Sequence, residues 1–344
     1  MSLRYALIRS AFEVLALSRV TGLIRARSSC MGVIFTLHRV VPEPPAEFSP
    51  NAILQVTPDY LAYAINRVRE LGFEIVTLDE AIRRVESGKK CRPFAVFTFD
   101  DGYRDNLLYA LPVLRELDCP FTLYVPTAFI DGVGEIWWQA LEDIIAGREA
   151  MMIRQGGTQD FFDLATTVLK RQAYDTLYWR MRRMPEAERV AFIHALAGQY
   201  DYDLERQCRM LIMGWDELQH VASESLCTIG AHTVHHYELA KLPAAEVRSE
   251  IEESLRVLKA QLGILPRHLS YPIGGAASAG PREFAIAAEL GLMSSVTTRL
   301  GGLYGSDRDN LQSLPRISLN GLFQARRYVD VFATGAVFSK LSEI

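Results

Sequence analysis

The sequence lacks three features that would place it in a special class of protein. Its five cysteines include no Cys-x-x-Cys pair, which argues against a disulfide framework or a zinc finger and favours a reducing compartment. No run of about 18 uncharged apolar residues is present, so no segment is predicted to span a membrane. Basic residues are not in excess, with 37 Lys and Arg against 41 Asp and Glu, so no nucleic acid partner is expected.

What is present is the composition of a globular protein. Hydrophobic residues make up 49% of the 344 residues and charged residues 23%. This balance excludes a disordered or fibrous chain. The length allows one large domain or two ordinary ones.

The first 30 residues are apolar but interrupted by charge. Arg9 and Glu13 break the uncharged core that a signal peptide needs, so residues 1–30 are predicted to form a basic amphipathic helix. Such a helix either packs on the domain or lies, through residues 3–25, on an anionic membrane surface. Because no signal peptide is predicted, we expect a cytoplasmic protein in both cases. In the second case it would be peripheral to the inner membrane.

Short β-branched runs alternate with segments of helical periodicity along the rest of the chain. Strands separated by helices of ten or more residues indicate parallel pairing with right-handed crossovers. About eight such units favour a (β/α) barrel over an open sheet. The predicted strands are residues 31–38, 73–78, 94–99, 121–125, 226–231, 269–271 and 294–298.

One stretch departs from this alternation. Residues 137–220 contain no convincing strand and are helical in character, so we predict a helical insertion in one loop of the barrel. The barrel domain is then residues 31–330, and residues 331–344 form a C-terminal tail.

Two motifs follow predicted strands. Asp100, Asp101 and Gly102 come directly after residues 94–99, where a parallel barrel places its active site. His232 and His236 follow the strand at 226–231, and a helical turn there would point both imidazoles to one side. Together with Asp101 they would make a two-His, one-carboxylate site for a divalent metal, most simply zinc. Either motif alone is weak evidence.

In combination, the two motifs resemble those of the polysaccharide deacetylase family, which shares the NodB homology domain of carbohydrate esterase family 4. The matching segments are Thr98-Phe99-Asp100-Asp101-Gly102 and His232-Thr233-Val234-His235-His236. The resemblance covers about residues 31–320. It implies an irregular (β/α) barrel of seven or eight strands and metal-dependent hydrolysis of the N-acetyl group of N-acetylglucosamine. It also implies that Asp100 is the general base and that Asp101, His232 and His236 bind the metal, with cobalt, nickel or manganese as alternatives to zinc.

A third segment is a variant of the family's third motif. Tyr271, Pro272, Ile273 and Gly274 align with its substrate-binding loop, where the backbone N–H of Ile273 would stabilise the oxyanion. Ser270 stands where the family usually has an arginine that orients the base. Arg316 is the favoured substitute, with Arg267 as a weaker one and a surface ion pair as the alternative for Arg316.

The family's Leu-x-His element, which supplies the general acid, is missing around Leu314. His38, at the end of the first strand, resembles the acid of deacetylases acting on poly-N-acetylglucosamine, so we predict that role for it; the alternative is a structural histidine. Aromatic residues near the site are candidates for stacking on sugars. They are Tyr103, Trp137, Trp138 and Tyr271.

The resemblance therefore implies a chitooligosaccharide or exopolysaccharide-intermediate deacetylase whose partner is an N-acetylated oligo- or polysaccharide. Two alternatives remain. One is a hydrolase of another amide on the same metal site, because fold does not settle chemistry. The other is a catalytically inactive carbohydrate-binding or assembly protein.

Overall fold

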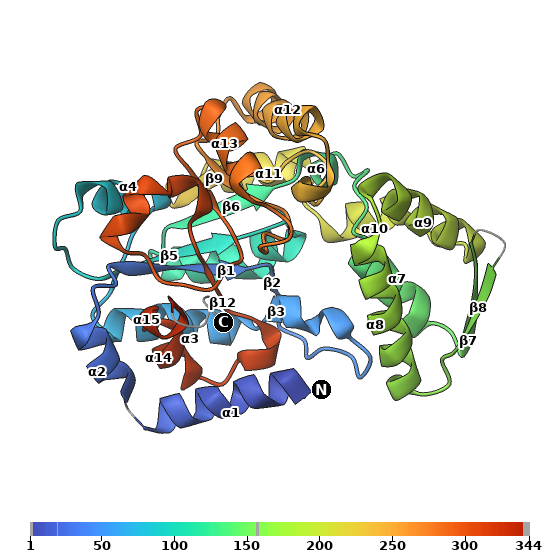
Figure 1. Ribbon diagram of the computed structural model, residues 1–344, viewed down its shortest axis with the longest axis horizontal. Coiled ribbons are helices and arrows are strands. Elements are labelled where there is room, and N and C mark those ends of the chain that lie inside the picture. Colours follow the sequence, from blue (N-terminus) through green and yellow to red (C-terminus); the bar gives the residue numbers. More distant parts are fainter. Residues whose placement is uncertain (1–2, 19, 156–157, 340–344) are drawn as a thin grey trace.

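The computed structural model describes residues 3–18, 20–155 and 158–339. Its centre is a curled parallel sheet in which the strands follow one another around the barrel in chain order (Figure 1). The strands of this path are β1 (Gly32–Leu37), β5 (Phe94–Phe99), β6 (Phe121–Val125), β9 (Cys227–Ala231), β10 (His268–Ser270), β11 (Ser294–Val296) and β12 (Ile317–Ser318).

The first and last strands close this sheet. β12 pairs with β1 in parallel, and Leu314, just before β12, forms a parallel bridge with Val296 of β11. The predicted irregular (β/α) barrel is therefore confirmed. The predicted strand at 73–78 is shorter than expected, because only β4 (Glu74–Ile75) pairs, at the start of β5 and off the main path.

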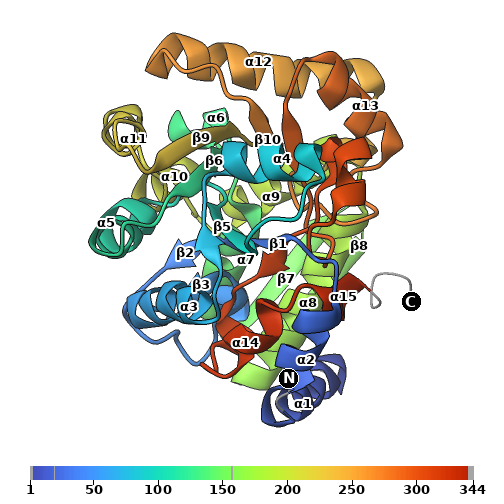
Figure 2. The same cartoon turned by 90° about the vertical axis from the view of Figure 1, so that its left-hand side faces the viewer.

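Helices on the outside connect the strands and bury one face each. Thr57 and Thr77 cap the first turns of α3 (Pro58–Glu70) and α4 (Leu78–Ser87), each accepting a hydrogen bond from a backbone N–H of that turn. α4 covers the end of the barrel where the strands begin (Figures 1 and 2). The remaining crossover helices are α5 (Leu111–Glu116), α6 (Thr127–Ile130), α12 (Ala244–Leu262) and α13 (Pro281–Glu289).

Alternation along the strands decides which side chains point into the barrel. Arg316 enters the interior and contacts Thr98 and Asp100, so the even-numbered residues of β5 face inward. Parallel register puts Thr36 of β1 beside Thr98, which places His38 on the same inner face as Asp100. The carboxyl ends of β1 and β5 therefore present chemically active side chains to one interior.

The segment between β6 and β9 differs from its prediction. It contains the helices that were expected, but also an antiparallel hairpin of β7 (Ala150–Gln155) and β8 (Thr158–Asp163), so the prediction of no strand here is wrong. Among the β7 residues whose burial is described, 150–154, Met151 and Ile153 are buried, a period-two pattern too short to stand out between helices. The helices are α7 (Trp137–Ala146), α8 (Thr167–Arg183), α9 (Glu186–Gln199), α10 (Leu204–Leu211) and α11 (Trp215–Ala222).

The N-terminal region is two helices, α1 (Leu3–Leu17) and α2 (Val20–Arg27), where one was predicted. α1 packs on α14 (Tyr328–Phe332): the Phe12 ring meets Tyr328 and Phe332, and Glu13 pairs with Arg327. The predicted tail at 331–344 is thus partly helical and packed, through α14 and α15 (Ala336–Ser339); residues 340–344 lie outside the described residues.

Candidate active site and metal centre

Three side chains from two loops form one buried cluster. The Nε2 atoms of His232 and His236 lie 3.5 and 3.3 Å from Oδ1 of Asp101. Two atoms that each bind a tetrahedral zinc ion from about 2.1 Å are about 3.4 Å apart, so the cluster has the spacing of a ligand set. Among the described residues, Asp101 Oδ1 has no well-oriented hydrogen-bond donor. The residues present therefore fit a divalent metal ion.

A hydrogen bond determines which ring nitrogen of His232 faces the cluster. His232 Nδ1 lies 2.6 Å from the carbonyl oxygen of Ser270, which can only accept, so Nδ1 carries the proton. In the neutral imidazole with this tautomer, Nε2 holds the lone pair that a metal ligand needs. Burial lowers the pKa of His236, which keeps this imidazole neutral at pH 7.

The carboxylate of the cluster stays ionised. Burial alone would raise the pKa of Asp101, but the two imidazoles beside it outweigh burial and hold that pKa well below its usual range. An anionic carboxylate and neutral imidazoles are the protonation states that a zinc site requires.

The histidines converge in a different way from the one predicted. Residues 232–237 form an irregular loop, not a helical turn, and Thr233 and His236 take positive φ angles of 66° and 59°. Glu250 of α12 holds this loop by accepting hydrogen bonds from the backbone N–H groups of Val234 and His235. Sequence reasoning missed Glu250; the available signal was an acidic residue on the mainly apolar face of the helix at 244–262.

His235 lies apart from the cluster. Its Nδ1 lies 2.6 Å from Glu250 Oε1, and its ring stacks on Tyr237. The hydrogen bond to Glu250 raises the pKa of His235. This imidazole therefore serves the loop and faces away from Asp101.

Asp100 is held by a buried arginine. Nη1 and Nη2 of Arg316 donate to Oδ1 and Oδ2 of Asp100 over 2.8 and 2.7 Å, and Nη2 also donates to Ser270 Oγ at 3.0 Å. Burial raises the pKa of Asp100, but the Arg316 charge and hydrogen bonds outweigh it, so the net shift is downward. Arg316 is 1% exposed, which excludes the surface ion pair considered for it.

The other arginine considered for this place is elsewhere. Arg267 is exposed and pairs with Asp79. Ser270 stands where the family motif has its arginine, and its small side chain leaves room for the guanidinium that arrives from the segment before β12.

His38 follows β1 and is half-buried, and its electrostatic interaction with Asp100 and Asp101 contributes to lowering the pKa of both carboxyl groups. Asp105 and Asn106, which follow the Asp-Asp-Gly turn, fix the backbone at and after His38. Asn106 Nδ2 donates to the His38 carbonyl oxygen at 2.8 Å. Asp105 accepts from the Val40 backbone N–H at 2.9 Å, within the short strand β2 (Arg39–Val40). Sequence reasoning did not single out Asp105 or Asn106.

The loop after β10 contains the predicted substrate-binding segment. Ile273 and Gly274 both have positive φ, 63° and 64°, and Thr298 Oγ1 donates to the Ile273 carbonyl oxygen at 2.7 Å. The Gly274 N–H donates to the Pro272 carbonyl oxygen, which tightens this turn. The turn begins one residue after Ser270, which contacts Arg316 and Asp100.

The aromatic residues of the predicted sugar platform are buried. Tyr271 is on the outer face of its strand, where its ring meets Phe284 and its hydroxyl donates to the Gln312 carbonyl oxygen. Tyr103 accepts a hydrogen bond from Trp138 Nε1. Neither tyrosine has an exposed ring face, so the prediction that they stack on a sugar is wrong for this structure.

The two tryptophans instead join the insertion to the metal cluster. The Trp138 ring centroid lies 5.1 Å from that of His236, on the side where Phe129 also packs. Trp137 packs against Tyr178 of α8. The start of α7 therefore supports His236 and shields it from water.

Unusual backbone conformations gather at this site. Asp101, Thr233, His236 and Ile273 have positive φ without being glycine, and each such residue costs about 1 kcal/mol or more. The other described non-glycine residues with positive φ are Asp118 and Asp201. Strain of this kind persists where the surrounding structure enforces it, as it does around the cluster.

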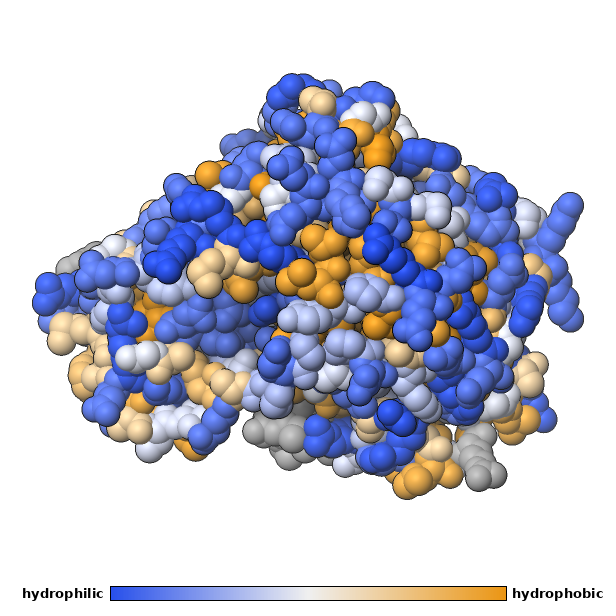
Figure 3. Space-filling view, turned by 180° about the vertical axis from the view of Figure 1, so that it is seen from behind, coloured by the Kyte–Doolittle hydropathy of each residue, from blue (hydrophilic) through white to orange (hydrophobic). Residues whose placement is uncertain are grey.

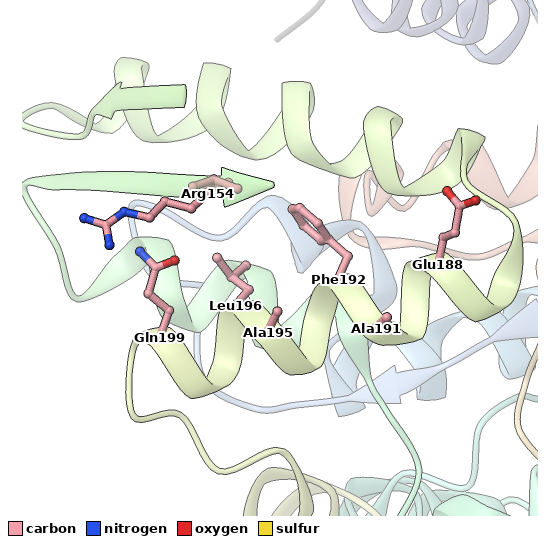
Figure 4. Close-up of a pocket in the computed structure, with 8 residues that line it drawn as sticks. Arg154, Glu188, Ala191, Phe192, Ala195, Leu196 and Gln199 are labelled. Atoms are coloured by element: carbon pink, nitrogen blue, oxygen red, sulfur yellow. The ribbon is translucent and has the colours of Figure 1, made fainter. Parts of the chain in front are cut away.

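A separate cavity of about 290 Å³ lies in the insertion, between β7 and α9 (Figure 4). Phe192 and Leu196 line its apolar wall, and Arg154, Glu188 and Gln199 stand along it. It contains no His–carboxylate cluster and is distinct from the site described above.

Fold and site together define an α/β barrel with an Asp–His–His metal-type centre beside an arginine-held carboxylate. The family model for polysaccharide deacetylase matches residues 157–293, which include His232 and His236. No curated protein sequence matches the chain.

Solved structures share the fold over most of the chain. Streptococcus pyogenes deacetylase PplD in complex with acetate is 17% identical, with a TM-score of 0.58 over 88% of this chain and 97% of that one. IcaB from Ammonifex degensii is 18% identical, with a TM-score of 0.54 over 89% and 97%. BC0361, a polysaccharide deacetylase from Bacillus cereus, is 13% identical, with a TM-score of 0.53 over 87% and 68%. These comparisons confirm the resemblance to the polysaccharide deacetylase family.

Proposed function

We propose that this protein hydrolyses the N-acetyl group of N-acetylglucosamine residues in an oligo- or polysaccharide and depends on a divalent metal for this. One observation carries the proposal: a carboxylate held ionised by Arg316 stands next to the buried Asp101–His232–His236 cluster. The match to polysaccharide deacetylases and the fold shared with them support the same reaction class.

The cluster supplies the place for the metal. Asp101, His232 and His236 would hold a divalent ion, which would supply Lewis acidity toward the amide carbonyl and lower the pKa of water. Zinc fits the two-histidine, one-carboxylate donor set best, and cobalt, nickel and manganese are the alternatives.

The remaining steps fall to this chain's own groups. Asp100 is ionised at neutral pH and accepts a proton from the attacking water. The backbone N–H of Ile273 would donate to the oxyanion that forms on the amide carbonyl. His38 would protonate the departing amine, which completes release of acetate and a free amino sugar.

Acetate release from N-acetylglucosamine oligomers tests the proposal, using protein stripped of metal and then resupplied with Zn²⁺ or Co²⁺. Asp100→Asn should abolish turnover and still bind zinc. His232→Ala should lose zinc affinity by about 100-fold or more, because even groups behind the ligands are worth 10–100-fold. His235→Asn is the matched control and should keep both zinc and activity, since its imidazole faces Glu250.

The outcomes separate the alternatives. Metal-restored release supports the proposed reaction. Tight zinc binding without release from any oligomer would shift the activity to another amide, and normal turnover by the Asp100 variant would refute the assigned base. A protein that binds neither zinc nor cobalt would be an inactive binding or assembly protein.

A further inference from the structure

The N-terminal helices have two apolar faces, and the fold uses only one of them. Phe12 is buried against the rings of Phe323, Tyr328 and Phe332. Ile8, Leu15 and Ala16 are partly buried on the same core. This inward face explains why α1 docks on the barrel. It does not account for the apolar residues on the other side.

The second face is open to solvent. Val14 and Leu17 of α1 are 67% and 74% exposed, and Val20 and Leu23 of α2 are 39% and 53% exposed. We call these four residues the outer stripe. Their spacing of three keeps Val14 next to Leu17 on one helix and Val20 next to Leu23 on the other. α1 forms the lower edge of the molecule, below α14, and α2 lies next to α14 above α1 in two perpendicular views (Figures 1 and 2). Hydrophobic residues protrude there among hydrophilic ones (Figure 3).

The charge around the outer stripe has one sign. The acidic residue of this region is Glu13, and Arg327 neutralises it through a hydrogen bond of 2.7 Å from its Nε. Three exposed arginines belong to this region: Arg9 in α1, which donates to the Leu322 carbonyl oxygen, Arg27 in α2, and Arg326 just before α14. The whole chain carries a formal charge of −4, so this local excess of positive charge is not a property of the surface at large.

We infer that the outer stripe lies on an anionic lipid surface. Exposed valine and leucine flanked by arginine suit the boundary between acyl chains and headgroups, with the helix axes in the plane of the membrane. Arginines close to an anionic surface add attraction that weakens as salt rises. None of the described helices has the length and apolarity that crossing a membrane requires, so contact would be peripheral.

The inference does not depend on the proposed activity. It concerns residues of α1 and α2, none of which belongs to the Asp101–His232–His236 cluster, and binding is measured without turnover. If the protein is a deacetylase, the surface would bring it to substrates that are anchored in the same membrane.

Flotation of the full chain with lipid vesicles tests the inference. The wild-type protein should float with vesicles of phosphatidylcholine containing phosphatidylglycerol, float poorly with phosphatidylcholine alone, and dissociate as salt is raised. Val14→Ser/Leu17→Ser/Leu23→Ser should lower binding by about tenfold or more, since each removed apolar side chain takes area out of the membrane contact. Arg9→Gln/Arg27→Gln should reduce binding to anionic vesicles only.

A matched control removes apolar residues of similar exposure elsewhere. Met210→Ser/Leu265→Ser changes side chains that are 63% and 59% exposed on α10 and after α12, and should leave binding unchanged. No binding by the wild-type protein, or equal loss in the control, would overturn the inference. So would a concentration-dependent dimer in light scattering that the stripe variant abolishes, since a second copy would then cover these residues.

Discussion

The buried pair between Arg316 and Asp100 gives the sharpest test of the site. Arg316→Met keeps much of the side-chain volume but removes the charge, and it leaves Asp100, 2% exposed, without its bidentate partner. Removing one member of a buried pair costs about 3–5 kcal/mol in the free energy of unfolding. The loss should appear as a lower midpoint in guanidinium unfolding.

The same change predicts the direction of a pH effect. In the wild-type protein Arg316 outweighs burial and lowers the pKa of Asp100, so the carboxylate stabilises the fold above its unfolded pKa. That stabilisation is lost as pH falls through the lower, folded pKa. Without Arg316, burial dominates and the pKa of Asp100 rises. The acid limb of kcat/KM for acetate release should therefore move to higher pH, and kcat should fall by about 100-fold as the base loses its orientation.

Two controls make the reasoning refutable. Arg67 makes a similar two-point pair with Asp330 at a half-buried position, so Arg67→Met should cost at most about 1 kcal/mol and leave the pH profile unchanged. Asp100→Asn added to Arg316→Met removes the unpaired charge and should restore most of the lost stability. If Arg316→Met unfolds at the wild-type midpoint and keeps the wild-type acid limb, Arg316 does not control the charge of Asp100.

Two further changes probe the loops around the site. Asn106→Ala removes the hydrogen bond to the His38 carbonyl oxygen and should lower the free energy of unfolding by about 1 kcal/mol. It should also lower kcat for acetate release more than it raises KM. An unchanged kcat would show that this hydrogen bond does not position His38. Gly274→Ala should destabilise more than Gly263→Ala in thermal unfolding. Both glycines have positive φ, which costs alanine about 1 kcal/mol, but only at Gly274 would the new Cβ lie 2.8 Å from the backbone nitrogen of Thr298. Equal losses would mean that this contact relaxes freely.

Periodicity and strand-end position indicated the barrel, and the resemblance carried by the two motifs singled out the residues that cluster in it. Asp100 and Asp101 follow a buried strand, and parallel strands bring their carboxyl ends together, so proximity to His232 follows from topology. The path from His232 to His236 could not be predicted in the same way. It depends on left-handed conformations at Thr233 and His236 and on hydrogen bonds from Glu250, which come from a helix far along the chain.

The burial of the aromatic residues was likewise a tertiary property. Tyr271 lies next to Ser270, and strand alternation sends one of the two inward and the other outward. The sequence shows an aromatic residue near the site but does not show which side of the strand it takes. The hairpin β7–β8 was missed for a related reason, because two buried residues are too few to reveal a period of two.

The placement of Arg316 gives the barrel a consequence for the order of folding. The guanidinium that holds Asp100 comes from 216 residues further along the chain, in the segment that joins β11 to β12. During synthesis, Asp100, Asp101, His232 and His236 emerge before Arg316. The cluster and its arginine are therefore incomplete until the last strand pairs with the first, and the onset of the proposed acetate release in a refolding experiment would report closure of the barrel.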